Sequence, residues 1–226
     1  MVLSAAALVV GNEILSGKFS ERNIFPLAKE FFALGFELRK VVVCPDEEDC
    51  IVQELRSLKR SHDVIVTSGG VGPTHDDITI RSVAAAFDVP VVRSPRMEQM
   101  LRDHHGEKCT EAHLRMADMP RGARLVTTPE MPWPTLVIED VFIFPGVPEI
   151  FVRKLDVLRQ ELAGRGSFSS RELHLLCEET AVAPLLDRIS AAHTEVNIGS
   201  YLRWAARDSG GYRTKLTVDG RDPEAV

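Results

Sequence analysis

The sequence predicts an α/β fold: a three-layer, doubly wound, mostly parallel but mixed sheet with helices on both faces, followed by a small α+β domain. Two observations carry this prediction. Apolar, β-rich runs alternate with segments of helical period, which is the pattern of consecutive β-α-β units. The chain has 226 residues and is 44% hydrophobic, which is enough for a sizeable buried core.

Three strands are expected in the first part of the chain, each an apolar run, at residues 5–10, 36–43 and 64–67. The segment 23–34 carries apolar residues at helical spacing, and Gly35 is placed to end that helix. After the second strand, the acidic run 45–49 is expected to supply the N-cap and first turn of another helix.

Three helices are expected after the glycine-rich turn that follows residue 67. The first runs to Phe87, and the others open at Ser94 and Thr110, which are typical N-cap residues. Two apolar runs within 137–144 predict a hairpin, which makes the sheet mixed. Apolar residues at helical spacing from Ile150 to Leu162 predict the last helix of this domain.

The first domain is expected to span residues 1–163. Glycines and serines without periodicity between 164 and 170 mark a linker. Residues 170–226 then form a β-α-β-β unit, with strands at 171–177, 195–199 and 212–218 and a helix at 181–192. Residues 221–226 resemble the opening of a further helix, so we expect this domain to be truncated at its C-terminus.

The net charge narrows the class of ligand, and the cysteines indicate the cellular compartment. A net charge of -6 and a pI of about 5.7 argue against binding to nucleic acid or to an anionic membrane surface. No apolar run approaches the roughly 20 residues that span a membrane. The four cysteines are scattered without a CxxC pair, so neither a zinc knuckle nor a disulfide framework is indicated. We therefore expect a cytoplasmic protein that acts on a small molecule.

The glycine-rich turn after the third strand is the most informative feature. Three glycines within four residues, Gly69, Gly70 and Gly72, let the backbone approach a ligand, and the following helix start is partially positive, which suits phosphate. The turn has neither the GKS/T of a Walker loop nor the GxGxxG spacing of a dinucleotide-binding fold. A tight strand-to-helix turn without a ligand is the alternative interpretation.

Carboxylates follow two neighbouring strands of the predicted sheet. Asp76 and Asp77 come after the glycine-rich turn, and Asp46 comes after the second strand. Because the C-terminal ends of strands converge on one crevice in an open α/β sheet, we expect Asp46 and Asp77 to meet there and hold a divalent metal. Helix capping is the alternative role for these aspartates, and His75 is either a further ligand or solvated.

Two further strand ends reach the same edge. Gly11 and Glu13 follow the first strand, and Gly146 lies in a turn between two prolines. Glu13 either positions a ligand or is simply exposed. The turn at Gly146 either gives a close backbone approach to a ligand or is only a turn.

Together these motifs resemble the molybdopterin-binding domain of the CinA family (competence/damage-inducible protein A) and of the N-terminal half of eukaryotic FAD synthase. The resemblance covers residues 5–160 and depends on ordered segments at 11–17, Asn23, 45–46, 67–79, 115–117 and 144–148. Residues 196–201 and 212–222 are similar to the small domain that follows in that family. Two positions differ from the family's usual pattern: Glu21 stands where it has aspartate, and Leu202 where it has proline.

The resemblance implies a sheet shared with the molybdenum-cofactor proteins MogA and MoaB, and a homo-oligomer. It also implies metal-dependent hydrolysis of the pyrophosphate bond in ADP-ribose or FAD-like dinucleotides. Asp46 and Asp77 match catalytic positions, and Asp46, Asp76 and Asp77 would hold Mg²⁺, Mn²⁺ or Co²⁺. The implied ligand-binding residues are Gly11, Glu13, Asn23, Ser68, Gly69, Gly70, Gly72, Pro73, Thr74 and Gly146.

Two other interpretations stay open. The domain either binds molybdopterin or transfers a nucleotide to it, because pterin and dinucleotide both combine phosphate with a flat heterocycle, or it is a non-catalytic scaffold. No part of the chain resembles the amidohydrolase domain of full-length CinA or the adenylyl-transfer domain of FAD synthase. Deamidase and FAD-synthesis activities are therefore not expected.

Overall fold

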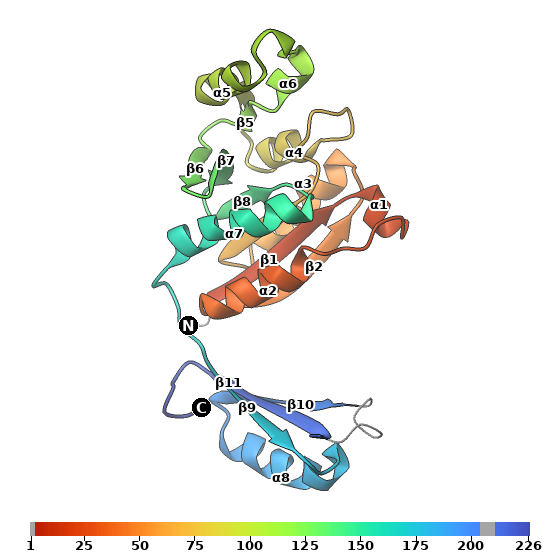
Figure 1. Ribbon diagram of the computed structural model, residues 1–226, viewed down its shortest axis with the longest axis vertical. Helices are drawn as coiled ribbons and strands as arrows, with labels where there is room; N and C mark the ends of the chain where they lie inside the picture. Colours follow the sequence, from red (N-terminus) through yellow and green to blue (C-terminus); the bar gives the residue numbers. More distant parts are fainter. Residues whose placement is uncertain (1–2, 204–210) are drawn as a thin grey trace. The chain divides into compact units, whose positions relative to one another are not determined.

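A computed structural model describes residues 3–203 and 211–226 of the chain (Figure 1). The chain forms two compact units, one that ends at Ala163 and one that begins at Gly164. All four cysteines are free. Within the described residues, no helix is both long enough and apolar enough to span a membrane.

Six strands form the sheet of the first unit, in the spatial order β2-β1-β3-β8-β7-β6. β2, β1, β3 and β8 are parallel to one another, whereas β7 is antiparallel to β8 and to β6. The predicted mixed, mostly parallel sheet is therefore confirmed. The strand bounds are β1 Leu3–Val10, β2 Phe36–Cys44, β3 Val64–Ser68, β6 Arg124–Thr128, β7 Met131–Ile138 and β8 Val141–Phe144.

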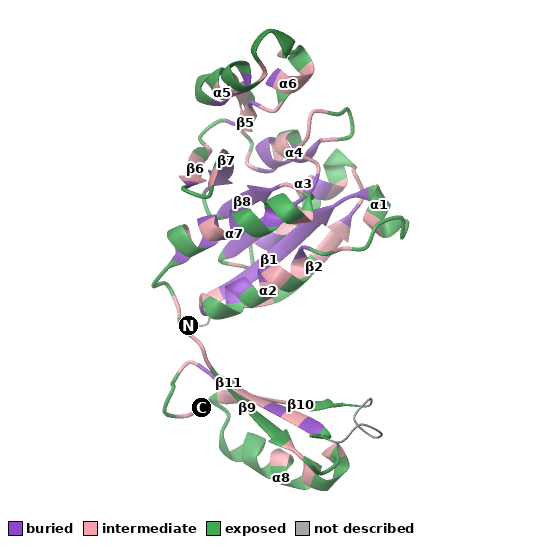
Figure 2. Cartoon of the chain, viewed as in Figure 1, coloured by how far each residue is buried: buried purple, intermediate pink, exposed green. Residues whose placement is uncertain are grey.

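Helices cover both faces of this sheet, which gives the predicted three layers. Because side chains alternate along a strand, β1 contributes to both cores: Ala5 and Ala7 pack with α2 and α7, and Ala6 and Leu8 pack with α3 and α4. In Figure 2, β1 is buried between helices whose outer residues are exposed. The helix bounds are α2 Ile24–Ala33, α3 Glu48–Lys59, α4 Thr79–Ala86 and α7 Pro148–Leu162.

The helix starts agree with the sequence in two places and in part at a third. Ser94 caps α5 (Pro95–His105) by accepting the Met97 N–H at 3.3 Å, and Thr110 forms a capping box at α6 (Glu111–Arg115). The acidic run before α3 supplies the expected N-cap residue, Glu47, and an acidic first turn, but no side chain makes a capping hydrogen bond there. Asp46 instead accepts the N–H of Asn12, the first residue of the short helix α1 (Asn12–Leu15), at 2.8 Å.

Several elements of the first unit were not predicted. β4 (Val91–Arg93) and β5 (Asp118–Pro120) form a separate two-stranded antiparallel sheet beside α5, α6 and the 3-10 turn η1 (Gly106–Lys108). β6 was also missed. The hairpin partner β7 begins earlier than expected, at Met131.

The second unit has the predicted β-α-β-β order. Its three strands pair antiparallel in the order β10-β11-β9. Leu202, where the family has proline, is the last residue of β10 and pairs with Thr214. The bounds are β9 Ser169–Leu175, α8 Glu179–Ala192, β10 Val196–Leu202 and β11 Thr214–Gly220.

Candidate functional site

Three glycines meet at the C-terminal edge of the parallel strands. Gly11, Gly69 and Gly146 follow β1, β3 and β8, which lie side by side in the sheet. The Gly69 N–H donates to the carbonyl of Phe144 at 3.2 Å. A Cβ on Gly146 would lie 3.3 Å from the Cα of Gly69, so these two turns are nearly in backbone contact. The strand ends therefore converge at one edge, as the sequence predicted.

The loop after β3 requires glycine at two consecutive positions. Gly69 has φ +104 and Gly70 has φ +64, and both values belong to the left-handed region. A Cβ on Gly69 would lie 2.3 Å from the carbonyl oxygen of Val10, and one on Gly70 would lie 2.4 Å from the Oγ1 of Thr79. Thr79 also donates its hydroxyl to the Gly69 carbonyl and its N–H to the Gly70 carbonyl. The loop carbonyls are thus tied to α4.

The N–H groups of this loop differ from its carbonyls in their hydrogen bonding. Among the residues that the structure describes, the N–H groups of Gly70, Val71 and Gly72 have no hydrogen-bond acceptor. All three residues line a cavity of about 1070 Å³. Three consecutive unpaired donors beside a cavity form a ready binding site for an anion.

The remainder of this cavity combines an apolar wall with charged groups at several points. The charged and titratable residues that line it are Glu13, His75, Asp77, Arg81, Arg115, Asp118 and Lys154. The larger apolar residues that line it are Phe19, Val71, Ile80, Val91, Met97, Met116, Trp133, Leu136, Ile143, Val147 and Ile150. An anion site beside such a wall suits a ligand that joins phosphate to a flat ring.

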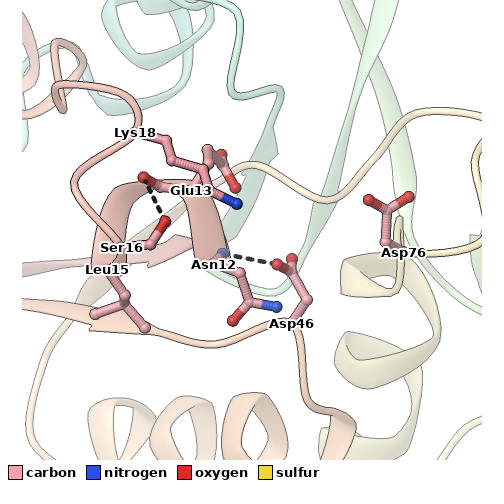
Figure 3. A pocket seen from close by; sticks show the side chains of 7 residues that line it. All are labelled: Asn12, Glu13, Leu15, Ser16, Lys18, Asp46 and Asp76. Atoms are coloured by element: carbon pink, nitrogen blue, oxygen red, sulfur yellow. Dashed lines mark hydrogen bonds between the residues drawn. The ribbon is translucent and has the colours of Figure 1, made fainter.

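A second hollow, of about 590 Å³, adjoins the first at Glu13, which lines both (Figure 3). Asp46 and Asp76 also line it, and they come from different loops in Figure 3. One Asp46 oxygen accepts the Asn12 N–H at 2.8 Å, so the segment that follows β1 holds this carboxylate in place. The second hollow is therefore the acidic part of the crevice.

Thr74 holds the two adjacent aspartates together. Its N–H donates to Asp77 Oδ2 at 2.8 Å, and its hydroxyl lies within hydrogen-bond distance of both Asp76 Oδ1 and Asp77 Oδ2. A threonine hydroxyl has a single proton, so it donates to only one of the two carboxylates at a time. The hydrogen bond from Thr74 lowers the pKa of Asp76, which keeps its carboxylate charged in mildly acidic solution.

The predicted metal ligands do not form a closed cluster. The structure places Asp46 with Asp76 in the smaller hollow and Asp77 with the glycine loop in the larger cavity. No three His, Cys, Asp or Glu side chains of the described residues are close enough to hold an ion. His75 is 97% exposed and lies 3.9 Å from Asp76. The donor set nevertheless fits a magnesium-type ion, which takes one or two carboxylates from a protein and its other ligands from water and substrate phosphate.

Asn23 lies behind the glycine turns. It is 4% exposed, and its Nδ2 donates to the Ser68 Oγ and to the Gly146 carbonyl, both at 2.9 Å. Asn23 therefore joins the end of β3 to the turn after β8, and neither Asn23 nor Ser68 lines the cavity. Glu21, which replaces the family's aspartate, still reaches the N–H groups of Asn23 and Ile24, at 2.7 and 3.0 Å.

Replacing Asn23 with alanine is expected to lower the free energy of unfolding by about 1–2 kcal/mol, because two hydrogen bonds are lost and the buried Ser68 hydroxyl loses a donor. The measurement is urea denaturation, with the exposed Asn197→Ala as the matched control. Equal midpoints for the two variants would contradict this role of Asn23.

Sequence reasoning missed Lys154, which lines the cavity from α7 and is 3% exposed. The signal was present, because Lys154 lies three residues after Phe151 and four before Leu158 and so falls on the apolar stripe of the helix. A lysine on such a stripe is uncommon unless it is paired.

Comparisons with known proteins agree with this geometry. Residues 6–163 match the family described as a probable molybdopterin binding domain, and residues 167–226 match the middle domain of FAD synthase. The crystal structure of CinA from Thermoplasma acidophilum, a protein of unknown function, is similar with a TM-score of 0.65 and 29% identity, over 70% of this chain and 97% of that one.

Two relatives illustrate the range of the similarity. A protein of Archaeoglobus fulgidus is 28% identical over 96% of this chain and 90% of its own length. A probable FAD synthase of Caenorhabditis elegans is 30% identical over 99% of this chain, which spans only 48% of that protein. The family match covers most of the chain, and the fold and strand-end loops are consistent with it. The chain therefore belongs to the molybdopterin-binding domain family and is related to CinA and to FAD synthase.

Proposed function

We propose that this protein is a metal-dependent pyrophosphatase that hydrolyses the pyrophosphate bond of ADP-ribose or an FAD-like dinucleotide. The observation that supports this proposal most strongly is the run of unpaired N–H groups at Gly70, Val71 and Gly72 on the cavity wall. Such donors bind a phosphate in the ground state and stabilise the additional charge that develops on it during hydrolysis.

The size of the cavity favours a dinucleotide over a mononucleotide. Its volume of about 1070 Å³ lies at the upper end of the range for small-molecule sites, and the acidic hollow adjoins it at Glu13. In the proposed complex the pyrophosphate lies against the glycine loop. The base packs on the apolar wall, where Trp133 and Met116 offer flat and adaptable surfaces.

The carboxylates lie beside this phosphate position. Asp46, Asp76 and Asp77 would hold Mg²⁺, Mn²⁺ or Co²⁺, which when bound supplies positive charge to phosphate oxygens and acidifies water for attack. Asp46 is oriented by the Asn12 N–H, and Asp77 is oriented by Thr74. These two hydrogen bonds orient the carboxylates before a ligand arrives.

The test is the release of AMP from ADP-ribose and from FAD by the purified protein with Mg²⁺, Mn²⁺ or Co²⁺, and its loss on addition of EDTA. Product formation with at least one substrate and one metal is the expected result. No AMP from either substrate with any of the three metals would contradict the proposal. Calorimetric titration with molybdopterin and with ADP-ribose then decides whether the domain instead binds a pterin.

A further inference from the structure

Lys154 is a buried cation without an acidic partner. It lies on α7, is 3% exposed, and donates to three neutral acceptors: the carbonyls of Trp133 and Pro134, at 3.2 and 3.1 Å, and the Thr135 hydroxyl, at 2.9 Å. Within the described part of the chain no carboxylate lies at ion-pair distance from it. A buried charge of this kind is costly to keep unless it has a role.

The carboxylates on the elements packed around Lys154 are paired elsewhere. Glu30 of α2 and Asp156 of α7 both bind Arg159, and Glu161 of α7 binds Arg124 of β6. Glu149 is exposed in the first turn of α7, Lys29 of α2 is exposed, and β7 has no charged residue. Arg153, on the other side of α7, is exposed as well. Three carboxylates line the same cavity as Lys154, those of Glu13, Asp77 and Asp118, but in the described structure none of them forms an ion pair with it. Lys154 therefore has no direct acidic partner there.

The three acceptors of Lys154 belong to consecutive residues at the start of β7. Trp133 and Pro134 line the large cavity, as Lys154 does. This part of β7 is weakly held by the sheet, since its pairing with β8 covers only Leu136–Ile138 and its pairing with β6 is irregular near Val126. The ammonium group of Lys154 thus adds three hydrogen bonds to Trp133–Thr135, a segment in which only Thr135 has a strand partner.

We infer that Lys154 is a positioning residue of the cavity: its ammonium group holds the Trp133–Thr135 wall in place and provides a buried positive charge that an anionic ligand balances. A phosphate at the glycine loop faces the same cavity and would favour the charged form of Lys154. The second part of this inference rests on the proposed function, whereas the first does not.

The protonation state of Lys154 supplies the readout. Burial lowers its pKa to about 8, so the ammonium form predominates at neutral pH and is lost on mild alkalinisation. A neutral amine keeps two protons for the carbonyls of Trp133 and Pro134 and can accept from the Thr135 hydroxyl, so above that pH the hydrogen bonds to the wall become neutral and weaker and the positive charge beside Trp133 is lost. An anionic ligand raises the pKa again, because it stabilises the charged form.

The test uses the tryptophan next to Lys154 as a reporter. The sequence has two tryptophans, Trp133 and Trp204, so Trp204→Phe leaves Trp133 alone. In this background we expect Trp133 emission to change with a midpoint near pH 8. Lys154→Met should abolish the transition, and the exposed Lys29→Met should keep it. Trp133 emission that does not change with pH in the Trp204→Phe protein would overturn the positioning role. The same transition after Lys154→Met would overturn it as well.

Lys154→Arg is a second variant that tests the same role if Lys154→Met does not fold. Arginine keeps the charge and the donors at all relevant pH values, so this variant should fold and show no transition. A transition near pH 8 in Lys154→Arg would also overturn the assignment.

ADP-ribose is then added in EDTA, which prevents turnover, and its binding is followed in parallel by equilibrium dialysis. Its pyrophosphate stays doubly charged across this pH range, so any change comes from the protein. Bound ADP-ribose should raise the midpoint by about one pH unit, which corresponds to roughly tenfold tighter binding to the charged form. Bound ligand without a shift would overturn the charge-balancing role, while AMP release would still decide the proposed function separately.

Discussion

Replacing Gly69 with alanine is expected to abolish ADP-ribose hydrolysis and to lower the free energy of unfolding by about 3 kcal/mol. Part of this cost is the left-handed backbone, which an alanine adopts with a penalty of about 1 kcal/mol. The larger part is the clash of the new Cβ, 2.3 Å from the carbonyl oxygen of Val10, which is backbone of the central strand β1 and has little room to move. Relief of the clash requires the loop to shift, and its N–H groups shift with it.

Gly122→Ala is the matched control, because Gly122 also has a positive φ, +90, but no atom lies within 4 Å of the Cβ position. This substitution should lower the free energy of unfolding by only about 1 kcal/mol and leave the rate of AMP release unchanged. Denaturant unfolding gives the stabilities, and AMP release gives the rates. If Gly69→Ala were as stable and as active as Gly122→Ala, the tight approach of the loop to β1 would not matter for function.

Asp77→Asn is expected to reduce the rate of AMP release by about a hundredfold or more while it leaves stability within about 1 kcal/mol. Asparagine can still accept the Thr74 N–H through its carbonyl oxygen, so the loop keeps its shape. What is lost is the negative charge beside the glycine loop, which the proposed divalent ion requires. Because the loop is preserved, binding of ADP-ribose in EDTA should change little.

Asp103→Asn serves as its control, because Asp103 is an exposed residue of α5 that lines neither hollow. It should retain full activity. An Asp77→Asn protein as fast as the wild type would exclude Asp77 from the chemistry. A fall in rate explained entirely by weaker binding in EDTA would assign Asp77 to loop structure instead.

The sequence was sufficient for the parallel strands of the central sheet, because these strands carry strong local signals, but not for β6. β1 and β3 are continuous apolar runs, as strands covered on both faces must be. β4 and β5 escaped prediction because each has three residues and depends on a partner distant in sequence. β7 contains two prolines, Pro132 and Pro134, which are rare inside a sheet; both lie before Leu136, where pairing with β8 begins, so their missing N–H groups cost no bond to β8.

The position of the site followed from the strand order, but the arrangement of its side chains did not. Loops at the ends of parallel neighbouring strands must converge, which placed Gly11, Gly69 and Gly146 at one edge. Side-chain direction does not follow from topology: Asp46 shares its hollow with Asp76 instead of Asp77. Asn23 was expected at the ligand but is buried behind the turns, where its Nδ2 donates to the Ser68 hydroxyl and to the Gly146 carbonyl.

The unpaired N–H groups of the glycine loop are central to the proposed activity, and amide NMR spectroscopy tests their role directly. The protein is titrated with a non-hydrolysable methylene analogue of ADP-ribose in the presence of Mg²⁺. We predict that the amide signals of Gly70, Val71 and Gly72 shift most, because these donors acquire a phosphate acceptor. Saturable binding that moves other signals and leaves these three unchanged would contradict the account.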